Sequence, residues 1–361
     1  MKQTMKACVL EGIGDLRLED VDMPQPAEDE VLLRVCACGI CSSDIPRIYK
    51  TGTYHFPTIP GHEFAGEIVA AGSAEYEHLI GRRASVFPLK PCFKCPSCME
   101  GAYARCDSYD YYGSRCNGAY ARYLAVKVWN LVFYEGIADE QAALCEPAAV
   151  ALHALQRAGV YGSETAESKR ILIVGTGTIG LLTALWAQGF KASQVIIAGR
   201  SQDKLQLAGD IVKGADAIDS TAPDYEEQLL AMTQGHMADI VIECVGSDAA
   251  LAAAVRSAAK GGTLVLMGNP DGDMTLPKVV YWQILRRELT VKGTWNSEYS
   301  DSNNNWKQVI EAIKKGILST EGLITHSFPL EEYESALDTV RDRSAGSIKV
   351  MLRPNADNVS G

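Results

Sequence analysis

The chain has 361 residues, 47% hydrophobic and 22% charged, which excludes a disordered chain, a coiled coil and a disulfide mini-protein. Because single hydrophobic cores stop growing at about 250–300 residues, this length predicts two domains. The formal net charge of −11 argues against a nucleic-acid partner. Neither a secretory signal nor an apolar run long enough to cross a bilayer is visible, so we expect a cytoplasmic protein that does not enter the membrane.

The first third of the chain predicts a β-rich domain. Short apolar runs alternate there with Gly, Pro and Asp turn signals, which is typical of short strands. The expected strands cover residues 5–10, 30–37, 63–70, 83–88 and 119–126. A helical pattern follows from about Ala138 to Ala158, and the polar stretch 161–170 has no apolar period and is interpreted as a linker.

From Ile171 onward the pattern changes to alternating strands and helices. The expected strands at 171–174, 194–198, 239–244 and 262–267 are almost wholly apolar, as strands of a parallel sheet covered on both faces should be. The alternation predicts a doubly wound parallel sheet of the α/β class. A helix near 306–315 and a strand near 348–352 are expected after it.

Four of the eleven cysteines lie within 15 residues, at Cys92, Cys95, Cys98 and Cys106. Four thiolates at this spacing can close around one tetrahedral ion, and a shell of sulfur alone indicates a structural zinc. An iron–sulfur cluster uses similar spacing and is the alternative. In a reducing compartment we expect the remaining cysteines, Cys41 excepted, to be packed as core residues rather than joined as disulfides.

A second set of metal-binding residue types is dispersed along the chain at Cys41, His62 and Glu146, with Glu63 beside the histidine. A thiolate, an imidazole and a carboxylate provide three ligands and leave a fourth position open, as a catalytic zinc requires. Taken singly, a lone Cys is more often a small core residue and a lone His a hydrogen-bonded structural residue. The joint occurrence of these residues with the cysteine cluster favours a catalytic site.

A dinucleotide-binding motif, Gly175-Thr-Gly177-Thr178-Ile179-Gly180, follows an expected strand and opens an expected helix. The first Gly permits a tight turn, the second lets the backbone approach a pyrophosphate, and the third allows close packing of helix and strand. The helix N-terminus would then face the anion.

The end of the next strand, at Gly199, indicates which cofactor binds. NAD enzymes usually carry Asp or Glu there for the ribose 2′-hydroxyl, whereas this chain has Gly199-Arg200-Ser201, with Lys204 one turn further on. A guanidinium can pair with a 2′-phosphate. The sequence therefore favours NADP(H) over NAD(H), although Arg200 can also stack on adenine or face solvent.

Together these residues resemble the zinc-dependent medium-chain dehydrogenase/reductase (alcohol dehydrogenase) family, through the stretches GICSSD, PGHEFAGEIV, the four-Cys cluster, Glu146-Pro147 and VGTGTIG. Within that family the chain is similar to polyol and polyol-phosphate dehydrogenases. The resemblance implies a Rossmann domain, residues 159–295, inserted into a β-rich GroES-like catalytic domain formed by residues 1–158 and 296–361. It also implies a homodimer or homotetramer.

The resemblance assigns the catalytic zinc ligands to Cys41, His62 and Glu146, with Glu63 as an alternate carboxylate. The expected activity is hydride transfer between the nicotinamide cofactor and a secondary alcohol or ketone, on a polyol or polyol phosphate such as galactitol 1-phosphate. Ser43 is a candidate proton relay and equally a turn-capping Ser. Asp44 is a candidate partner that orients His62, and nearly as plausibly a turn residue.

Three basic residues, Arg47, Lys50 and Arg115, lie near these motifs and are candidates for binding a substrate phosphate, although each can equally be a surface charge. Two other functions stay open at this point. One is a zinc-free quinone or enoyl reductase on the same scaffold, and the other is a non-enzymatic protein that binds zinc and nucleotide.

Overall fold

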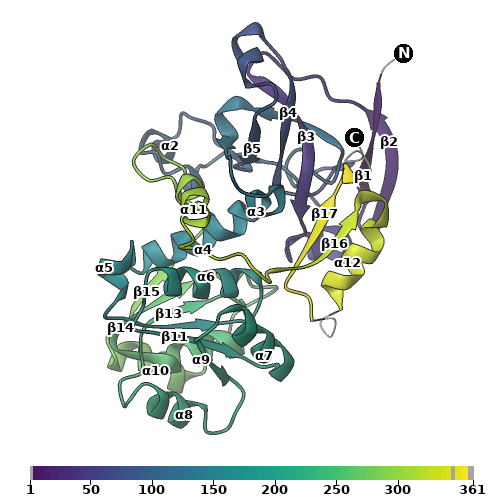
Figure 1. Cartoon of the computed structure of the whole chain (residues 1–361). Coiled ribbons are helices and arrows are strands. Elements are labelled where there is room, and N and C mark those ends of the chain that lie inside the picture. Colours follow the sequence, from purple (N-terminus) through teal and green to yellow (C-terminus); the bar gives the residue numbers. More distant parts are fainter. Residues whose placement is uncertain (1–2, 343–345, 357–361) are drawn as a thin grey trace. The chain divides into compact units, whose positions relative to one another are not determined.

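A computed structural model of the chain describes residues 3–342 and 346–356 and divides it into two compact units (Figure 1). Unit 1 comprises Met1–Glu146, Glu298–Lys314 and Ile324–Gly361, and unit 2 comprises Pro147–Ser297 and Lys315–Leu323. The first boundary therefore falls at Glu146 rather than at residue 158. The reason is that the following helix packs within unit 2, where Trp186 Nε1 donates a hydrogen bond to Ala148 O at 3.0 Å.

Unit 1 is built on a seven-stranded sheet in the order β16-β17-β3-β4-β5-β9, with β8 also paired to β3. Phe64 and Tyr120 are fully buried in its core. The strands are β3 (Glu30–Gly39), β4 (Glu63–Ala71), β5 (Arg83–Val86), β8 (Tyr123–Lys127), β9 (Leu131–Phe133), β16 (Ile324–Pro329) and β17 (Lys349–Arg353). A separate antiparallel hairpin is formed by β1 (Thr4–Gly12) and β2 (Asp15–Asp22).

The later part of the chain supplies two strands to this sheet. β17 pairs with β3 in antiparallel fashion, with Met351 opposite Gly39, and it pairs with β16 in parallel. The other elements of unit 1 are α1 (Asp44–Pro46), η1 (Arg47–Thr51), η2 (Ala74–Leu79), β6 (Leu89–Lys90), α2 (Pro96–Met99), η3 (Tyr103–Arg105), β7 (Asp110–Tyr111), η4 (Val128–Asn130), α3 (Asp139–Ala143), α11 (Asn305–Lys314), η5 (Leu330–Glu332) and α12 (Tyr333–Arg341).

Unit 2 contains a parallel six-stranded sheet in the order β12-β11-β10-β13-β14-β15. In Figure 1 helix α6 lies on one face of this sheet and helices α9 and α10 lie on the other. The strands are β10 (Arg170–Val174), β11 (Gln194–Gly199), β12 (Asp216–Asp219), β13 (Ala238–Glu243), β14 (Ala258–Leu266) and β15 (Thr290–Gly293). The helices are α4 (Cys145–Arg157), α5 (Ser163–Ala166), α6 (Thr178–Gly189), α7 (Gln202–Ile211), α8 (Tyr225–Met232), α9 (Asp248–Ser257) and α10 (Lys278–Arg286).

The strand order confirms the doubly wound parallel sheet that the sequence predicts. The chain leaves the central strand β10 toward β11 on one side and later returns to β13 on the other. In such sheets a ligand binds outside the carboxyl ends of the strands at this change of direction. None of the helices in the described ranges is long and apolar enough to span a bilayer.

Two local expectations need correction. The stretch 161–170, interpreted as a linker, contains the short helix α5. The single helix expected from Ala138 to Ala158 is divided at Leu144 into α3 and α4. Pro147 explains the division, because it has no N–H to continue the hydrogen bonding of α3 but is tolerated in the first turn of a new helix.

Candidate functional site

Strands β3 and β4 bring together Cys41, His62 and Glu63. In the antiparallel register Gly39 lies opposite Glu63, so the end of β3 and the start of β4 meet at the same edge of the sheet. One ligand atom of each of the three residues lies within 4.8 Å of the others. A thiolate sulfur, an imidazole nitrogen and a carboxylate oxygen form a donor set suited to zinc.

His62 is oriented by Asp44. Its side chain is buried, and its Nδ1 lies 3.4 Å from Asp44 Oδ1 without a hydrogen bond of good geometry. Burial disfavours the charged imidazole, but the charges of Asp44 and Cys41 outweigh it, so the pKa of His62 lies well above its ordinary value. The surroundings of this ring thus attract a positive charge, which a metal ion would supply through the other ring nitrogen.

Asp44 is fully buried and is held by several donors. Tyr120 Oη donates to its Oδ2 at 2.8 Å, and the backbone N–H of Cys41 donates to the same oxygen at 3.2 Å. Burial raises the pKa of this carboxyl, but His62 and the other donors lower it more strongly, to about 2. Asp44 therefore stays ionised and fixes both Cys41 and His62.

Glu63 shares its carboxylate with a lysine from the far end of the chain. Lys349 Nζ forms a buried ion pair with Glu63 Oε2 and donates to Ile40 O at 3.1 Å. A Cβ at Gly39 would lie 2.3 Å from Glu63 Oε2, so glycine is required there to accommodate this carboxylate. Glu63 Oε1 is the carboxylate oxygen that Lys349 does not engage.

Glu146 lies at the same end of the sheet but outside this group of three. In the described part of the chain no metal-sized cluster includes it. It is buried at the start of α4, and Tyr111 Oη donates to its Oε1 at 3.3 Å. Burial raises the pKa of Glu146 to about 7, with His62 opposing and Glu63 adding to the increase.

Ser43 lies between Cys41 and Arg47. Its hydroxyl donates to Cys41 Sγ at 3.2 Å and accepts a hydrogen bond from Arg47 Nη1 at 2.9 Å. It does not cap the following helix α1 through its side chain. The structure thus places the hydroxyl of Ser43 directly beside a candidate metal ligand.

The four clustered cysteines converge as the spacing predicts. Their sulfur atoms lie within 4.8 Å of one another, and Cys92 Sγ is 3.9 Å from Cys98 Sγ. A tetrahedral zinc with Zn–S bonds of 2.3 Å would place its sulfurs about 3.8 Å apart. Backbone N–H groups of Lys94 and Cys95 lower the pKa of Cys92 to about 6, which favours the thiolate form, whereas burial raises that of Cys98 to about 12.

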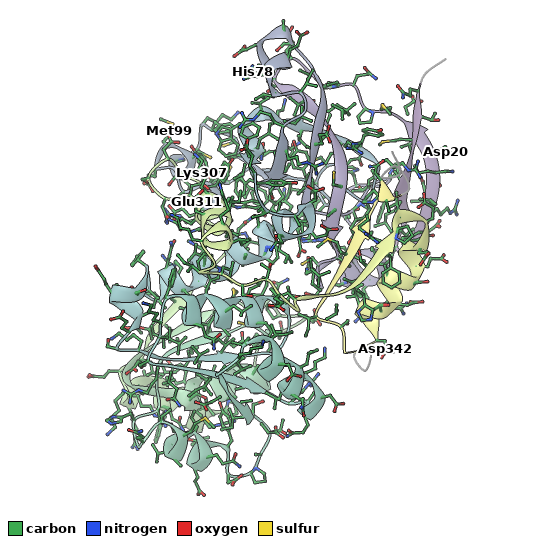
Figure 2. The ribbon with its side chains drawn as sticks, in the orientation of Figure 1. Asp20, His78, Met99, Lys307, Glu311 and Asp342 are labelled. Carbon is green, nitrogen blue, oxygen red and sulfur yellow. The ribbon has the colours of Figure 1, made fainter. Side chains whose placement is uncertain are left out.

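The segment that carries the four cysteines, residues 92–106, is called here the cysteine lobe. Aromatic side chains connect it to the rest of unit 1. Phe93 and Tyr103, from the lobe, lie 4.9 and 5.2 Å from the Trp129 ring, and Trp129 lies 5.0 Å from Tyr299. Tyr299 in turn stacks on Phe87 at 4.3 Å. Met99, which is 75% exposed on α2, lies on the lobe (Figure 2).

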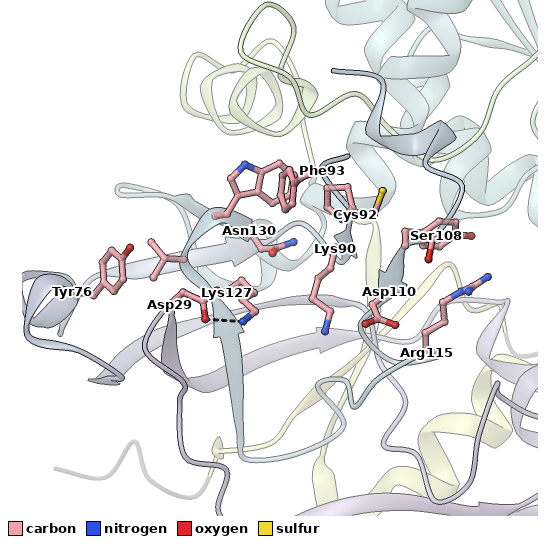
Figure 3. A pocket seen from close by; sticks show the side chains of 14 residues that line it. Asp29, Tyr76, Lys90, Cys92, Phe93, Ser108, Asp110, Arg115, Lys127 and Asn130 are labelled. Atoms are coloured by element: carbon pink, nitrogen blue, oxygen red, sulfur yellow. Dashed lines mark hydrogen bonds and ion pairs between the residues drawn. The ribbon is translucent and has the colours of Figure 1, made fainter. Parts of the chain in front are cut away.

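A cavity of about 690 Å³ lies next to the lobe (Figure 3), and Cys41, His62 and Glu63 are not among the residues that line it. Arg115 lines it and is placed between the rings of Tyr54 and Tyr109, at 4.0 and 4.5 Å. Lys50 is exposed on η1. Of the three basic residues that the sequence singled out, Arg47 is therefore the one that contacts the candidate site.

The dinucleotide motif occupies the loop between β10 and α6. Gly175 has a φ of +124°, and a Cβ there would lie 3.0 Å from Val245 Cγ2. Gly177 faces open space, and a Cβ at Gly180 would lie 2.1 Å from Gly175 O. These surroundings match the separate requirements for a turn, for ligand approach and for close packing. Thr178 and Ile179 begin α6.

The end of β11 has no room for a carboxylate. A Cβ at Gly199 would lie 2.7 Å from Thr176 Cγ2. Arg200 is exposed, and in the described residues its guanidinium has neither an ion pair nor a hydrogen bond. Ser201 caps α7, because its side chain accepts a hydrogen bond from the backbone N–H of Lys204.

Four further residues contribute to these sites without having been predicted. Lys349, Tyr111 and Tyr120 come from segments that carry no motif. Glu243, at the end of β13, accepts hydrogen bonds from the N–H groups of Val245 and Gly246 at 2.7 and 2.8 Å and so holds the loop beside Gly175. A carboxylate that directly follows the apolar run at residues 240–242 is the sequence signal for Glu243.

Comparison with known proteins agrees with this geometry. Residues 27–135 match the family described as alcohol dehydrogenase GroES-like domain, and residues 178–315 match the family described as zinc-binding dehydrogenase. Galactitol 1-phosphate 5-dehydrogenase from Escherichia coli (strain K12) is 33% identical over 97% of this chain and 100% of the relative. Sorbitol dehydrogenase from Bacillus subtilis is 30% identical over 98% of each chain.

Solved structures give the same result. The crystal structure of galactitol-1-phosphate dehydrogenase from Escherichia coli superposes with a TM-score of 0.87 at 31% identity, covering 97% of this chain and 100% of that one. A zinc-binding dehydrogenase from Sinorhizobium meliloti bound to NADP also gives a TM-score of 0.87, at 29% identity over 98% and 100% of the two chains. The chain therefore belongs to the zinc-dependent medium-chain dehydrogenase/reductase family and is an oxidoreductase of the alcohol dehydrogenase type.

Proposed function

We propose that this enzyme interconverts a secondary alcohol and a ketone on a polyol or polyol phosphate, with one catalytic and one structural zinc and with NADP(H) as the preferred cofactor. The group of Cys41, His62 and Glu63 within 4.8 Å supports the catalytic zinc most directly. Glu146 is proposed as a further ligand, because it is buried beside this group and electrostatically coupled to His62 and Glu63.

A zinc ion held by these residues would act as a Lewis acid on the substrate oxygen, while the nicotinamide exchanges a hydride with the neighbouring carbon. The residues of the chain prepare that site. Asp44 Oδ1 lies 3.4 Å from Nδ1 of His62, on the side of the ring away from its other nitrogen, which stays available. Ser43, whose Oγ lies 3.2 Å from Cys41 Sγ, is placed to exchange a proton with a substrate oxygen that approaches the same side.

The four cysteines of the lobe are proposed to hold the structural zinc. Sulfur separations near those of a tetrahedral shell support it, and four sulfur ligands would leave no coordination position for substrate. Metal analysis of the purified protein tests both sites together. We expect about two zinc ions per chain, whereas one or none would contradict the two-zinc proposal.

The proposed preference for NADP(H) rests on Gly199 and Arg200. The contact of a Gly199 Cβ with Thr176 disfavours the carboxylate that binds a ribose 2′-hydroxyl. Arg200 is exposed and has no ion pair or hydrogen bond among the described residues, so its guanidinium is available to a 2′-phosphate. Steady-state kinetics with NADPH and NADH on one ketose test this choice. An equal or higher kcat/KM with NADH would contradict it.

Galactitol 1-phosphate is the substrate we propose to test first, because the relative named for it matches this chain over nearly its full length. The decisive assay is a panel of free and phosphorylated polyols with NADP+ and NAD+, with zinc counted in the same preparation. Reduction of quinones or enoyl compounds in place of polyol oxidation would contradict the proposed substrate class.

We propose a homodimer or homotetramer, in which a second copy covers α10 and the edge strand β15. Val279, Leu285 and Val291 are 68%, 57% and 42% exposed there, and an edge strand presents unpaired backbone groups. Light scattering of the wild type and of Leu285→Glu tests this surface. A cytoplasmic location is proposed as well, because none of the eleven cysteines forms a disulfide.

A further inference from the structure

We infer that Arg47 forms a subsite for an oxyanionic group of the substrate, a phosphate or a carboxylate, beside the Cys41 group. The inference rests on the proposed dehydrogenase function and adds a substrate class to it. Arg47 begins η1, the turn that follows α1, and its side chain is 29% exposed. It therefore lies partly inside the site and partly open to an incoming molecule.

The hydrogen bonds of Arg47 leave one edge of its guanidinium free. Nη1 donates to Ser43 Oγ at 2.9 Å and to Asp44 Oδ1 at 3.3 Å. In the described part of the chain, Nε and Nη2 have no hydrogen-bond partner. These two nitrogens form a planar fork that matches the two oxygens of a carboxylate or phosphate.

The Asp44 carboxylate has other hydrogen-bonding partners besides Arg47. It already accepts from Tyr120 Oη and from the Cys41 N–H, and it faces His62 at 3.4 Å. The Arg47–Asp44 contact, at 3.3 Å through one nitrogen, is not the bidentate arrangement of a closed Arg–carboxylate pair. The guanidinium is thus anchored at one end and available at the other.

The other cations near the site are placed differently. Lys349 is committed to Glu63 and to Ile40 O, with its side chain 3% exposed. Lys50 is exposed on η1, and Arg115 lies in the separate cavity against two tyrosine rings. In a chain with a net charge of −11, an anionic substrate needs a local cation, and Arg47 is the one anchored to residues that flank Cys41.

The test compares three hexose derivatives that differ in charge at one end: galactitol 1-phosphate, galactonate and neutral galactitol. Arg47→Gln removes the charge but keeps an amide that can still donate to Ser43. We expect kcat/KM for the anionic substrate to fall about 10- to 100-fold more than kcat/KM for galactitol, because only the anion loses charge-assisted hydrogen bonds. The loss should appear mainly in KM, and Arg47→Lys should restore part of it.

Whichever anion loses more with Arg47→Gln identifies the oxyanion that this subsite binds. Lys50→Gln and Arg115→Gln are the matched controls and should leave the ratio of kcat/KM values for anionic and neutral substrates unchanged. Equal losses for galactitol and the anions would overturn the inference, because they would show that Arg47 merely positions Ser43. A change of the ratio with Arg115→Gln alone would overturn it as well.

If the proposed dehydrogenase function is wrong, these assays give a result that differs from the failure of the subsite. A zinc-loaded wild type that turns over none of the three compounds with either cofactor contradicts the dehydrogenase proposal. Calorimetric titration with galactitol 1-phosphate then decides the subsite separately. Binding that weakens about tenfold or more in Arg47→Gln supports the subsite, and no binding, or equal binding by both proteins, overturns it.

Discussion

Lys349 and Glu63 form an ion pair that is almost closed to solvent, with side chains 3% and 2% exposed. The two residues are separated by 286 positions in sequence and meet because β17 and β4 both pair with β3. Removing one member of such a pair leaves an uncompensated buried charge. The same ion pair therefore positions the candidate ligand Glu63 and contributes to the stability of unit 1.

Lys349→Met is expected to lower the free energy of unfolding of the metal-free protein by about 3–5 kcal/mol. The double variant Lys349→Met/Glu63→Gln, which removes both charges, should recover much of that loss. Urea unfolding measures both. Lys6→Met is the control, because its ion pair is exposed and should contribute at most about 1 kcal/mol. Its partner Asp20 lies on β2 (Figure 2). Equal effects of the two single variants would contradict this account.

Cys41→Ser and His62→Ala are expected to lose nearly all turnover and about one zinc per chain, because each removes a proposed ligand of the catalytic ion. The cysteine lobe should keep its own metal. Atomic absorption and circular dichroism of the same samples check the metal content and the fold. Full activity of the Cys41 variant would refute a metal-based mechanism at this site.

Cys95→Ser should have the opposite profile. It removes one ligand of the lobe, so we expect loss of the other zinc and a decrease in Tm of about 5–10 °C, whereas turnover per folded molecule should be largely kept. Trp129, which packs on Phe93 and Tyr103, should report the change by its fluorescence. An unchanged Tm together with an unchanged zinc content would show that these cysteines hold no metal.

Arg200→Ala is expected to reduce kcat/KM for NADPH by about 10- to 100-fold, since it removes a charge-assisted contact to the 2′-phosphate. The value for NADH should hardly change. Lys191→Ala, a substitution of another exposed cation in unit 2, serves as the control. If the two cofactors lose equally, Arg200 contacts a part that they share, and the proposed basis of the preference is wrong.

His153 predicts a pH dependence of stability that is separate from the metal site. Burial and the charge of Arg157 lower its pKa to about 4, from an ordinary value of 6.5. Between these values the unfolded chain binds a proton that the folded chain does not. Stability is therefore fully present above pH 6.5 and falls by up to about 3 kcal/mol as the pH decreases toward 4.

His153→Gln should flatten that part of the curve when unfolding is followed from pH 7 to pH 4. His78→Gln is the control, because this side chain is exposed (Figure 2). A steep decrease that persists in the His153 variant would assign the effect to other groups.

The sequence predicted the fold class because apolar runs and glycine spacing are local signals. The strands around Gly175 and the convergence of the four cysteines follow from short-range patterns of this kind. Lys349, Tyr111 and Tyr120 could not be predicted in the same way, because their contacts depend on register between distant segments. The first domain boundary lies earlier in the chain than the residue 158 that the sequence predicts, for a similar reason: α4 packs on Trp186, 38 residues from Ala148.

The pairing of β17 with β3 has a consequence for synthesis. Cys41, His62 and Glu63 lie on neighbouring strands and leave the ribosome early, together with the first part of unit 1. The lysine that balances Glu63 is made 286 residues later. Since domains tend to fold from the N-terminus as they are made, the nascent sheet must hold an unbalanced carboxylate until β17 arrives. Docking of that strand is thus a late step that completes unit 1 and its metal-binding edge together.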